Sequence, residues 1–256
     1  MRPSPSLLNR PQRLASVVST LAVSLAVVSL MLLAAAPLGW RLQLLPLRVS
    51  FTLLMGAGWV GKGAALLAAL GLVLAPRSLS WIRVVLLSCV VLLGLIFTYV
   101  PWHLRQEHTP PINDITTDTT NPPAIVAALP ARQAERAVSA VYGGPPVAQM
   151  QKAAFPDIGP VILAMPISRA FDLALNTAGS MPGWNIIAAD AHSFRIEATQ
   201  ASFWFGFTDD IVIRVTEDGT SSRIDIRSHS RQGRGDLGVN AARIRKYIAA
   251  LRSATG

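Results

Sequence analysis

Acidic residues are missing from the first 106 positions of the chain, and cysteine occurs once, at Cys89. A single cysteine excludes an intramolecular disulfide and leaves the redox compartment open. Charged residues of both signs make up only 14% of the 256 residues, whereas soluble globular proteins carry roughly 25%. The formal net charge of +9 divides into +8 before residue 105 and +1 from residue 105 onward. The basic excess therefore belongs to the charge-poor part of the chain.

Three apolar runs occupy this charge-poor part, at residues 14–38, 49–75 and 84–102. Each reaches about the 20-residue length that crosses a bilayer. The first run is longer than the apolar core of a signal peptide, which has about 7–15 residues, so we favour an uncleaved span. The basic residues lie between the runs, where they set membrane orientation. This placement argues against nucleic acid as a partner.

Three spans place the two termini on opposite sides of the membrane. The basic residues that flank the spans favour a cytoplasmic N-terminus by the positive-inside rule. They are Arg2, Arg10, Arg13, Arg77 and Arg83 on one side and Arg41, Arg48 and Arg105 on the other. We therefore expect a multi-pass protein of the bacterial inner membrane, with its C-terminal domain in the periplasm.

Lys62 lies near the middle of the second apolar run. An ionisable group at membrane depth often marks a transport pathway or a polar site, and nearby glycines allow helices to approach closely. A relay usually needs an acidic partner, and the sequence offers none before Glu107. We favour the simpler interpretation, in which the span is irregular or Lys62 reaches water by bending and local thinning of the bilayer, over a transporter-like role.

The chain after the third run begins with a polar, Pro-rich stretch, for which we expect an extended linker over residues 103–130. A domain of residues 131–256 should follow. Its first helix is expected at residues 131–142, where Gly143 and Gly144 would end it and two prolines would prevent its continuation. Residues 168–180 and 237–252 have the apolar spacing of two further helices.

Alternating apolar and polar residues predict the strands of this domain. Phe194, Ile196 and Ala198 fall on one face of a strand whose other face carries Arg195 and Glu197. Such alternation is typical of a half-buried antiparallel sheet. The expected strands are residues 160–165, 184–190, 193–207, 210–217 and 222–230. With helices packed on the apolar face, the fold class is a two-layer α+β domain.

Several segments of this domain resemble a known bacterial family, the domain of unknown function 1499. They are "INDITTDTTNPP" (residues 112–123), "FPDIGPV" (155–161), "FWFGFTDDIVIRV" (203–215) and "SRIDIRSHSRQGRGDLGVNAARI" (222–244). The resemblance covers roughly the last 150 residues and includes versions anchored by N-terminal spans. It implies an envelope-associated domain and carries over no reaction, substrate or catalytic residue. The family loop is usually similar to "GRSDLG", and Gly235 stands here in place of the serine.

Gly233, Gly235 and Gly238 form a GxGxxG pattern between a predicted strand and a predicted helix. In a dinucleotide site this loop is followed by a second parallel strand, with an acidic residue about 20 positions later. That position would lie beyond Gly256, so we exclude a bound nucleotide. The sequence predicts no cofactor.

The same loop leaves a second possibility open. The start of a helix favours an anion, and Arg227, Arg231 and Arg234 precede this one closely. They could bind a phosphate, a carboxylate or an anionic lipid headgroup. In the alternative interpretation Asp236 caps the helix and the arginines pair with carboxylates of the domain.

Polar residues of neighbouring strands offer another candidate site. Glu197, Arg214, Asp225 and His229 fall on the polar face of the sheet together with Arg227. In a hydrolase or transferase, Glu197 or Asp225 would act as the base and His229 as the proton shuttle. The alternative is a set of cross-strand ion pairs. The four histidines have no ligand spacing, so we expect no metal site.

Aromatic residues are dense at residues 203–207, where Trp204 lies among three phenylalanines. They could stack on a glycan or a lipid chain, but we expect most of them in the core. Taken together, we expect a non-enzymatic binding or interaction module of the cell envelope, with the membrane and an anionic lipid, an envelope component or an envelope protein as partners. The alternative is the hydrolase or transferase on the polar sheet face.

Overall fold

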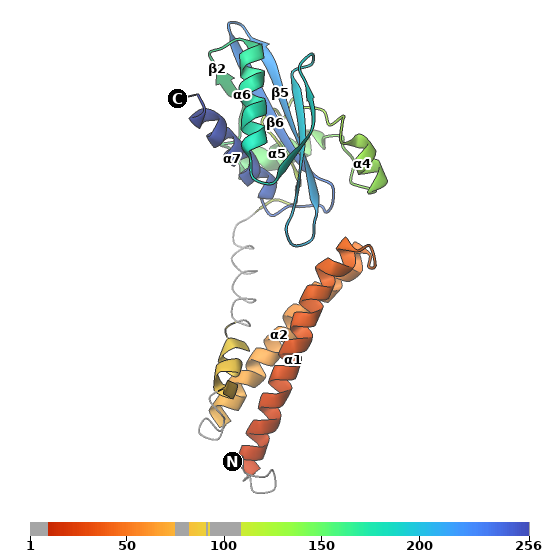
Figure 1. Cartoon of the computed structure of the whole chain (residues 1–256), viewed down its shortest axis with the longest axis vertical. Helices are drawn as coiled ribbons and strands as arrows, with labels where there is room; N and C mark the ends of the chain where they lie inside the picture. Colours follow the sequence, from red (N-terminus) through yellow and green to blue (C-terminus); the bar gives the residue numbers. More distant parts are fainter. Residues whose placement is uncertain (1–9, 75–81, 91, 93–108, 256) are drawn as a thin grey trace. The chain divides into compact units, whose positions relative to one another are not determined.

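The structure is a computed structural model that describes residues 10–74, 82–90, 92 and 109–255 (Figure 1). The chain divides into two compact units, Met1–Glu107 and His108–Gly256.

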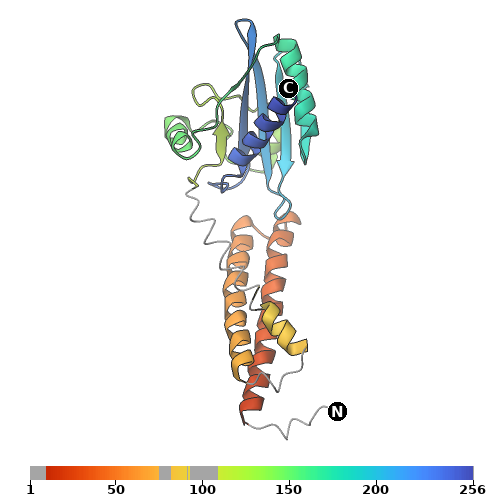
Figure 2. The same ribbon diagram turned by 90° about the vertical axis from the view of Figure 1, so that its left-hand side faces the viewer.

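The N-terminal unit contains two long helices, α1 (Arg10–Arg41) and α2 (Leu47–Leu74). They run side by side (Figure 2), and their stretches Arg13–Arg41 and Leu47–Leu74 are long and apolar enough to cross a membrane, with mean hydropathies of 2.5 and 1.7. The described residues thus hold two candidate spans rather than the three that we predicted. The third predicted span, residues 84–102, lies mostly outside the described residues; its described positions, 84–90 and 92, are helical.

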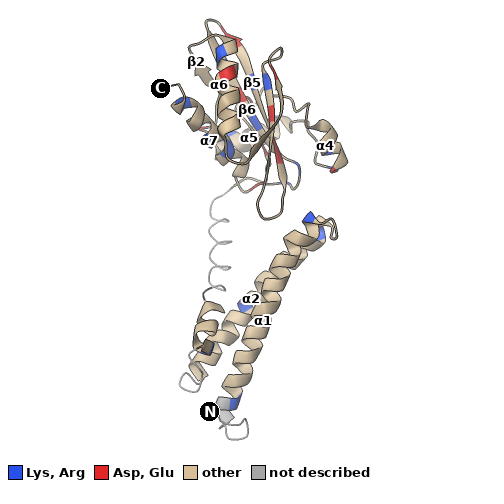
Figure 3. Ribbon diagram, viewed as in Figure 1, with Lys and Arg blue, Asp and Glu red and all other residues tan. Residues whose placement is uncertain are grey.

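Small residues allow α1 and α2 to pack closely. The Ser29 hydroxyl donates to the carbonyl of Ala57 at 2.8 Å, and a Cβ on Gly61 would lie 3.0 Å from the oxygen of that hydroxyl. Lys62 lies on α2 with its Nζ 4.8 Å from the centroid of the Trp59 ring. Figure 3 shows no acidic residue on α1 or α2.

The C-terminal unit is built on an antiparallel sheet with the order β1-β6-β5-β4-β3, in which β2 also pairs with β6. Both β1 and β2 lie along the outer edge of β6, at opposite ends of that strand: Asp114 of β1 is in register with His229, and Val161 of β2 with Ile224. The strands are β1 (Asp114–Thr116), β2 (Val161–Leu163), β3 (Trp184–Asp190), β4 (Arg195–Ala201), β5 (Thr208–Asp218) and β6 (Ser221–Ser230). This architecture confirms the predicted α+β class.

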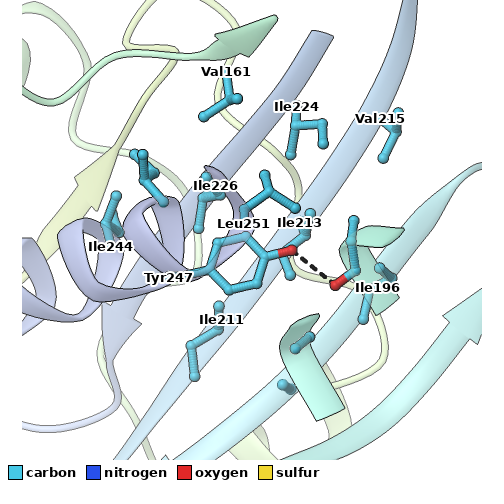
Figure 4. Close-up of a cluster of buried hydrophobic side chains, with 14 of the residues drawn as sticks. Val161, Ile196, Ile211, Ile213, Val215, Ile224, Ile226, Ile244, Tyr247 and Leu251 are labelled. Carbon is cyan, nitrogen blue, oxygen red and sulfur yellow. Dashed lines mark hydrogen bonds between the residues drawn. The ribbon is translucent and has the colours of Figure 1, made fainter. Parts of the chain in front are cut away.

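Two helices, α6 (Ile167–Ser180) and α7 (Val239–Ser253), cover one face of the sheet (Figures 1 and 2). The apolar positions of the alternating strands meet them there, as predicted. Tyr247 of α7 is fully buried, and its hydroxyl donates to the carbonyl of Ala174 in α6 at 2.8 Å (Figure 4). Burying each isoleucine of this core contributes about 1.5–3 kcal/mol to folding. The labelled members in Figure 4 are Val161, Ile196, Ile211, Ile213, Val215, Ile224, Ile226, Ile244, Tyr247 and Leu251.

The segment before α6 differs from the prediction. The helix expected at residues 131–142 is only α4 (Leu129–Ala134), and a second helix, α5 (Gly144–Ala154), begins where we expected a stop. Gly143 is the N-cap of α5 and prolines follow in its first turn, where the missing N–H of proline removes no helical hydrogen bond. The buried amide of Gln151 in α5 then binds both main-chain groups of Thr116, at 3.0 and 2.6 Å.

The predicted linker, residues 103–130, is not a linker over its described part. Residues 114–116 are strand β1 of the sheet, and Ile125 and Ala128 pack against Val212 of β5. The prediction failed because a strand of three residues is too short for its alternation of apolar and polar residues to be recognised.

Candidate functional site

The polar face of the sheet, opposite α6 and α7, is covered rather than exposed. Residues 117–142 lie across it, so Glu197 and Asp225 retain only 1% and 0% of their exposure, and Arg227 and His229 3% each. The alternating pattern predicted a solvated face. The alternation of apolar and polar residues within a strand cannot show that a segment about 70–110 positions away in the sequence covers that strand.

Glu197 holds this cover in place. Its carboxylate accepts hydrogen bonds from the amides of Val126 (3.0 and 3.2 Å), Ala127 (2.9 Å) and Ala128 (3.1 Å), and Arg195 lies 3.3 Å away. A carboxylate with this many donors has little capacity left to act as a general base.

Two arginines balance the negative charge of Asp225. Its Oδ2 accepts from Arg214 at 3.1 Å and from Arg223 at 2.8 Å, and its Oδ1 accepts from the Thr117 hydroxyl at 3.0 Å. Arg214 also binds Asp118 at 3.0 Å. Burial alone would raise the pKa of Asp118, but the amides of Asn121 and Thr120 and the two arginines lower it overall.

Arg227 and His229 lie beside Asp114 of β1. The Arg227 guanidinium binds the Asp114 carboxylate through two hydrogen bonds of 2.9 and 2.8 Å and also donates to the carbonyls of Pro123 and Ala140. Tyr142 places its ring 5.8 Å from the Arg227 guanidinium. Two polar atoms of this group, Tyr142 Oη and His229 Nδ1, are buried without a hydrogen bond in the described structure.

Both of these side chains are neutral at neutral pH. Burial lowers the pKa of His229 to about 4, although Asp114, whose Oδ2 lies 3.6 Å from Nδ1, opposes this shift. Burial and the nearby Asp114 raise the pKa of Tyr142 to about 12. A neutral imidazole far from its usual pKa is a poor proton shuttle near pH 7.

Arg231 belongs to the next ion-pair cluster. It binds Asp210 at 2.7 Å and Glu135 at 2.6 Å, and Asp210 is shared with Arg132 at 2.6 Å. Glu197, Asp225 and His229 therefore serve separate clusters. Asp225 and His229 are four residues apart on β6, a spacing of about 13 Å along a strand, so the structure does not bring the three together.

The predicted anion site at the start of α7 already contains a carboxylate of the chain. Asp236 accepts hydrogen bonds from the amides of Gly238 at 2.9 Å and Asn240 at 2.6 Å, and burial raises its pKa. Arg227 and Arg231 are engaged in the ion pairs described above, and Arg234 is exposed. The three arginines and Asp236 do not form one site.

The GxGxxG glycines serve the packing of this loop. A Cβ on Gly235 would lie 3.3 Å from the Cα of Pro111, and Gly238 has a φ of +80°. The Gly233 carbonyl accepts from the Asn113 side chain at 2.7 Å. The loop is thus a turn against residues 109–113.

Sequence reasoning missed a cleft of about 360 Å³ between α7 and the start of β3. Trp184 stacks on Tyr247 at 5.3 Å on one side, and the exposed Lys246 lies on the other. Arg243 is held in the floor by Gln200 at 2.6 Å and Asp209 at 2.5 Å. The sequence feature that could have indicated this cleft is the spacing of residues 239, 242, 243 and 246, which fall on one face of a helix. The lining residues are Met181, Pro182, Trp184, Gln200, Val239, Ala242, Arg243 and Lys246.

No cluster of His, Cys, Asp or Glu residues suited to a metal ion occurs among the residues that the structure describes. A family model described as "Protein of unknown function (DUF1499)" matches residues 114–251. No curated protein matches the sequence.

Proposed function

We propose a binding role, without catalysis, for this chain, which belongs to the DUF1499 family of proteins of unknown function. The chain is an inner-membrane protein with three spans and a cytoplasmic N-terminus. Its domain after residue 108 works in the periplasm as an envelope binding module. The observation that carries this proposal is the cleft between Trp184 and Lys246.

The chemistry of the cleft favours an amphipathic anion. Met181, Pro182 and Trp184 supply an apolar wall, and Lys246 supplies a cation at the lip. Its volume of about 360 Å³ falls in the range of small-molecule sites, roughly 300–1,000 Å³. Arg243 is already paired with Asp209, so it shapes the floor rather than adding net charge.

The alternative function, a hydrolase or transferase, draws no support from the geometry. Glu197, Asp225 and His229 are buried under residues 117–142 and have separate partners. Catalysis needs an acid or base within reach of a substrate, and a substrate would first have to displace this cover.

Binding of hexyl phosphate, which joins a short apolar chain to an anion, tests the proposal. We expect the full chain in amphipol to bind this probe in calorimetry, and the neutral analogue hexanol to bind more weakly. Lys246→Glu and Trp184→Ala should each weaken hexyl phosphate binding by about tenfold, the effect of roughly 1.4 kcal/mol.

Lys152→Glu is the matched control, because it reverses an exposed lysine on α5 outside the cleft. It should bind like the wild type. Equal affinity of the wild type and Lys246→Glu would contradict the proposal.

A further inference from the structure

Two loops of the C-terminal unit meet at one end of the sheet. The first, residues 202–207, joins β4 to β5, and the second, residues 233–238, joins β6 to α7. The carbonyl of Thr208 accepts from the amide of Arg231 at 2.9 Å. The amide of Ser230 in turn donates to the carbonyl of Asn113 at 2.9 Å. We call this region, residues 202–207 and 233–239, the loop end; residues 109–113 adjoin it.

The loop end displays large apolar side chains to solvent. Phe203 is 87% exposed, Trp204 48%, Leu237 61% and Val239 50%. Below them, Phe205 is only 7% exposed and stacks on Phe207 with ring centroids 5.0 Å apart. Exposed apolar side chains that gather in this way are typical of interaction surfaces.

Hydrogen bonds between its two ends close the first loop. The Ser202 amide donates to the Phe207 carbonyl at 2.8 Å, and the Gly206 amide donates to the Ser202 carbonyl at 2.9 Å. The Phe207 amide also donates to the Ser202 hydroxyl at 3.0 Å. The aromatic stretch that we expected mostly in the core is thus a closed loop, with its inner rings packed and its outer rings exposed.

Leu237 has a backbone conformation that a leucine rarely adopts, with a φ of +55°. Such a conformation is strained and tends to be retained at functional positions. In this conformation the apolar side chain of Leu237 is 61% exposed to solvent. The exposed Arg234 lies three residues away and adds a positive charge to the same loop.

The chain length ties the loop end to a membrane. Thr109, the first described residue of this unit, lies close to Gly238, since a Cβ on that glycine would meet its methyl carbon at 3.3 Å. The third apolar run of the sequence ends at Trp102. Seven residues reach at most about 25 Å, which limits how far Thr109 can lie from the residue at which the run ends.

We propose that the loop end docks onto the bilayer that holds the chain's own spans. Phe203, Trp204 and Leu237 insert at the headgroup level, where aromatic and apolar side chains are favoured, and Arg234 binds lipid phosphates. Val239 belongs both to the loop end and to the cleft, so the cleft opens beside the lipid. This docking rests on the proposed function. The ligand of the cleft would then be a membrane phospholipid whose phosphate lies at Lys246.

Depth-dependent quenching tests the docking. In a Cys89→Ser background, single cysteines replace Phe203, Leu237 or Ile162, and each carries a bimane label on the full chain in nanodiscs. Ile162 is the matched control because it is 50% exposed and lies on β2, at the opposite end of β6. With brominated phosphatidylglycerol in the nanodisc, quenching at positions 203 and 237 should exceed that at 162 by about twofold or more, because the bromine must approach the label.

Equal quenching at all three positions would overturn the docking, and would point to a protein as the partner of the loop end. A further variant, Phe203→Ser with Trp204→Ser, should reduce quenching of the label at position 237 about twofold in a protein with unchanged near-ultraviolet circular dichroism. Unreduced quenching would also count against it. The same variant should bind hexyl phosphate normally in amphipol, so a failure of docking is distinguishable from a failure of the cleft.

Discussion

Individual charged residues of the domain have internal partners that explain their burial. Asp225 and Asp114 accept from arginines, and Glu197 accepts from main-chain amides. Buried charges are tolerated when they are paired in this way. His229 differs from them, because its Nδ1 has no hydrogen bond in the described structure and its ring stays neutral.

The burial of His229 predicts a pH dependence of stability. Its pKa is about 4 in the folded domain, against about 6.5 in an unfolded chain. As the pH falls from 6.5 to 4, the unfolded state takes up a proton that the folded state does not, so the free energy of unfolding falls, by up to about 3 kcal/mol. This contribution is complete above pH 6.5 and lost below pH 4.

Thermal unfolding of the full chain between pH 7 and pH 4 measures this effect. His229→Gln should lose less stability over this interval than the wild type, and His192→Gln, a change at an exposed histidine, should lose as much. If His229→Gln and the wild type respond equally to acid, protonation of His229 does not control the transition.

Among the elements, those with a clear period were predictable and those defined by distant partners were not. Strands β3 to β6 and helices α6 and α7 agree with the sequence pattern to within a few residues, apart from residues 202–207, which form a loop. The glycine–proline run at residues 143–146 fits either the end or the start of a helix, and the local pattern did not distinguish them. β1 and the cover over the polar face depend on partners in β4, β5 and β6, which local spacing does not reveal.

The candidate site was likewise predictable only in part. The residue types of the polar face were identifiable from alternation, but their ion pairs were not, because Asp114 and Arg227 are far apart in sequence. The cleft depends on the contact of α7 with Trp184 at the start of β3, and the sequence showed only the spacing of residues on one face of α7. Asp236, which one of the two sequence interpretations placed at the start of α7, accepts from the amide of Asn240 there.

Helix α7 offers a prediction that separates capping from anion binding. Asp236→Ala removes the carboxylate that accepts from Gly238 and Asn240, which should destabilise the domain by about 1–2 kcal/mol. The vacated amides form an ordinary anion site. Sulfate at millimolar concentration should therefore raise the melting temperature of Asp236→Ala more than that of the wild type.

Asp218→Ala, at the exposed end of β5, is the control for this experiment and should show no extra response to sulfate. A variant at position 236 that ignores sulfate would mean that the amides are not accessible to an outside anion.

At the scale of the whole molecule, the orientation in the membrane is the first property to establish. A cytoplasmic N-terminus and three spans would place the C-terminus outside the cytoplasm. Alkaline phosphatase fused after Gly256 should then be active, because this enzyme folds only outside the cytoplasm. Green fluorescent protein fused at the same position should be dark, because it does not fluoresce when exported through the general secretion route. Five flanking basic residues against three support this orientation.

Fusions at residue 44, between α1 and α2, and at residue 79 complete the test. Phosphatase should be active at position 44 and inactive at position 79. A fluorescent C-terminal fusion with inactive phosphatase would reverse the orientation or remove one span.

The position of β6 in the chain has a consequence for biogenesis. Residues 221–230 pair with β5 on one side and with both β1 and β2 on the other, so three strands made earlier have no complete partner until this one appears. Contacts between such distant segments form late and slowly. The sheet of the domain therefore cannot be completed until almost all of the domain has been synthesised. For the periplasmic location proposed above, this order of the strands would keep the domain competent for translocation until its sheet closes.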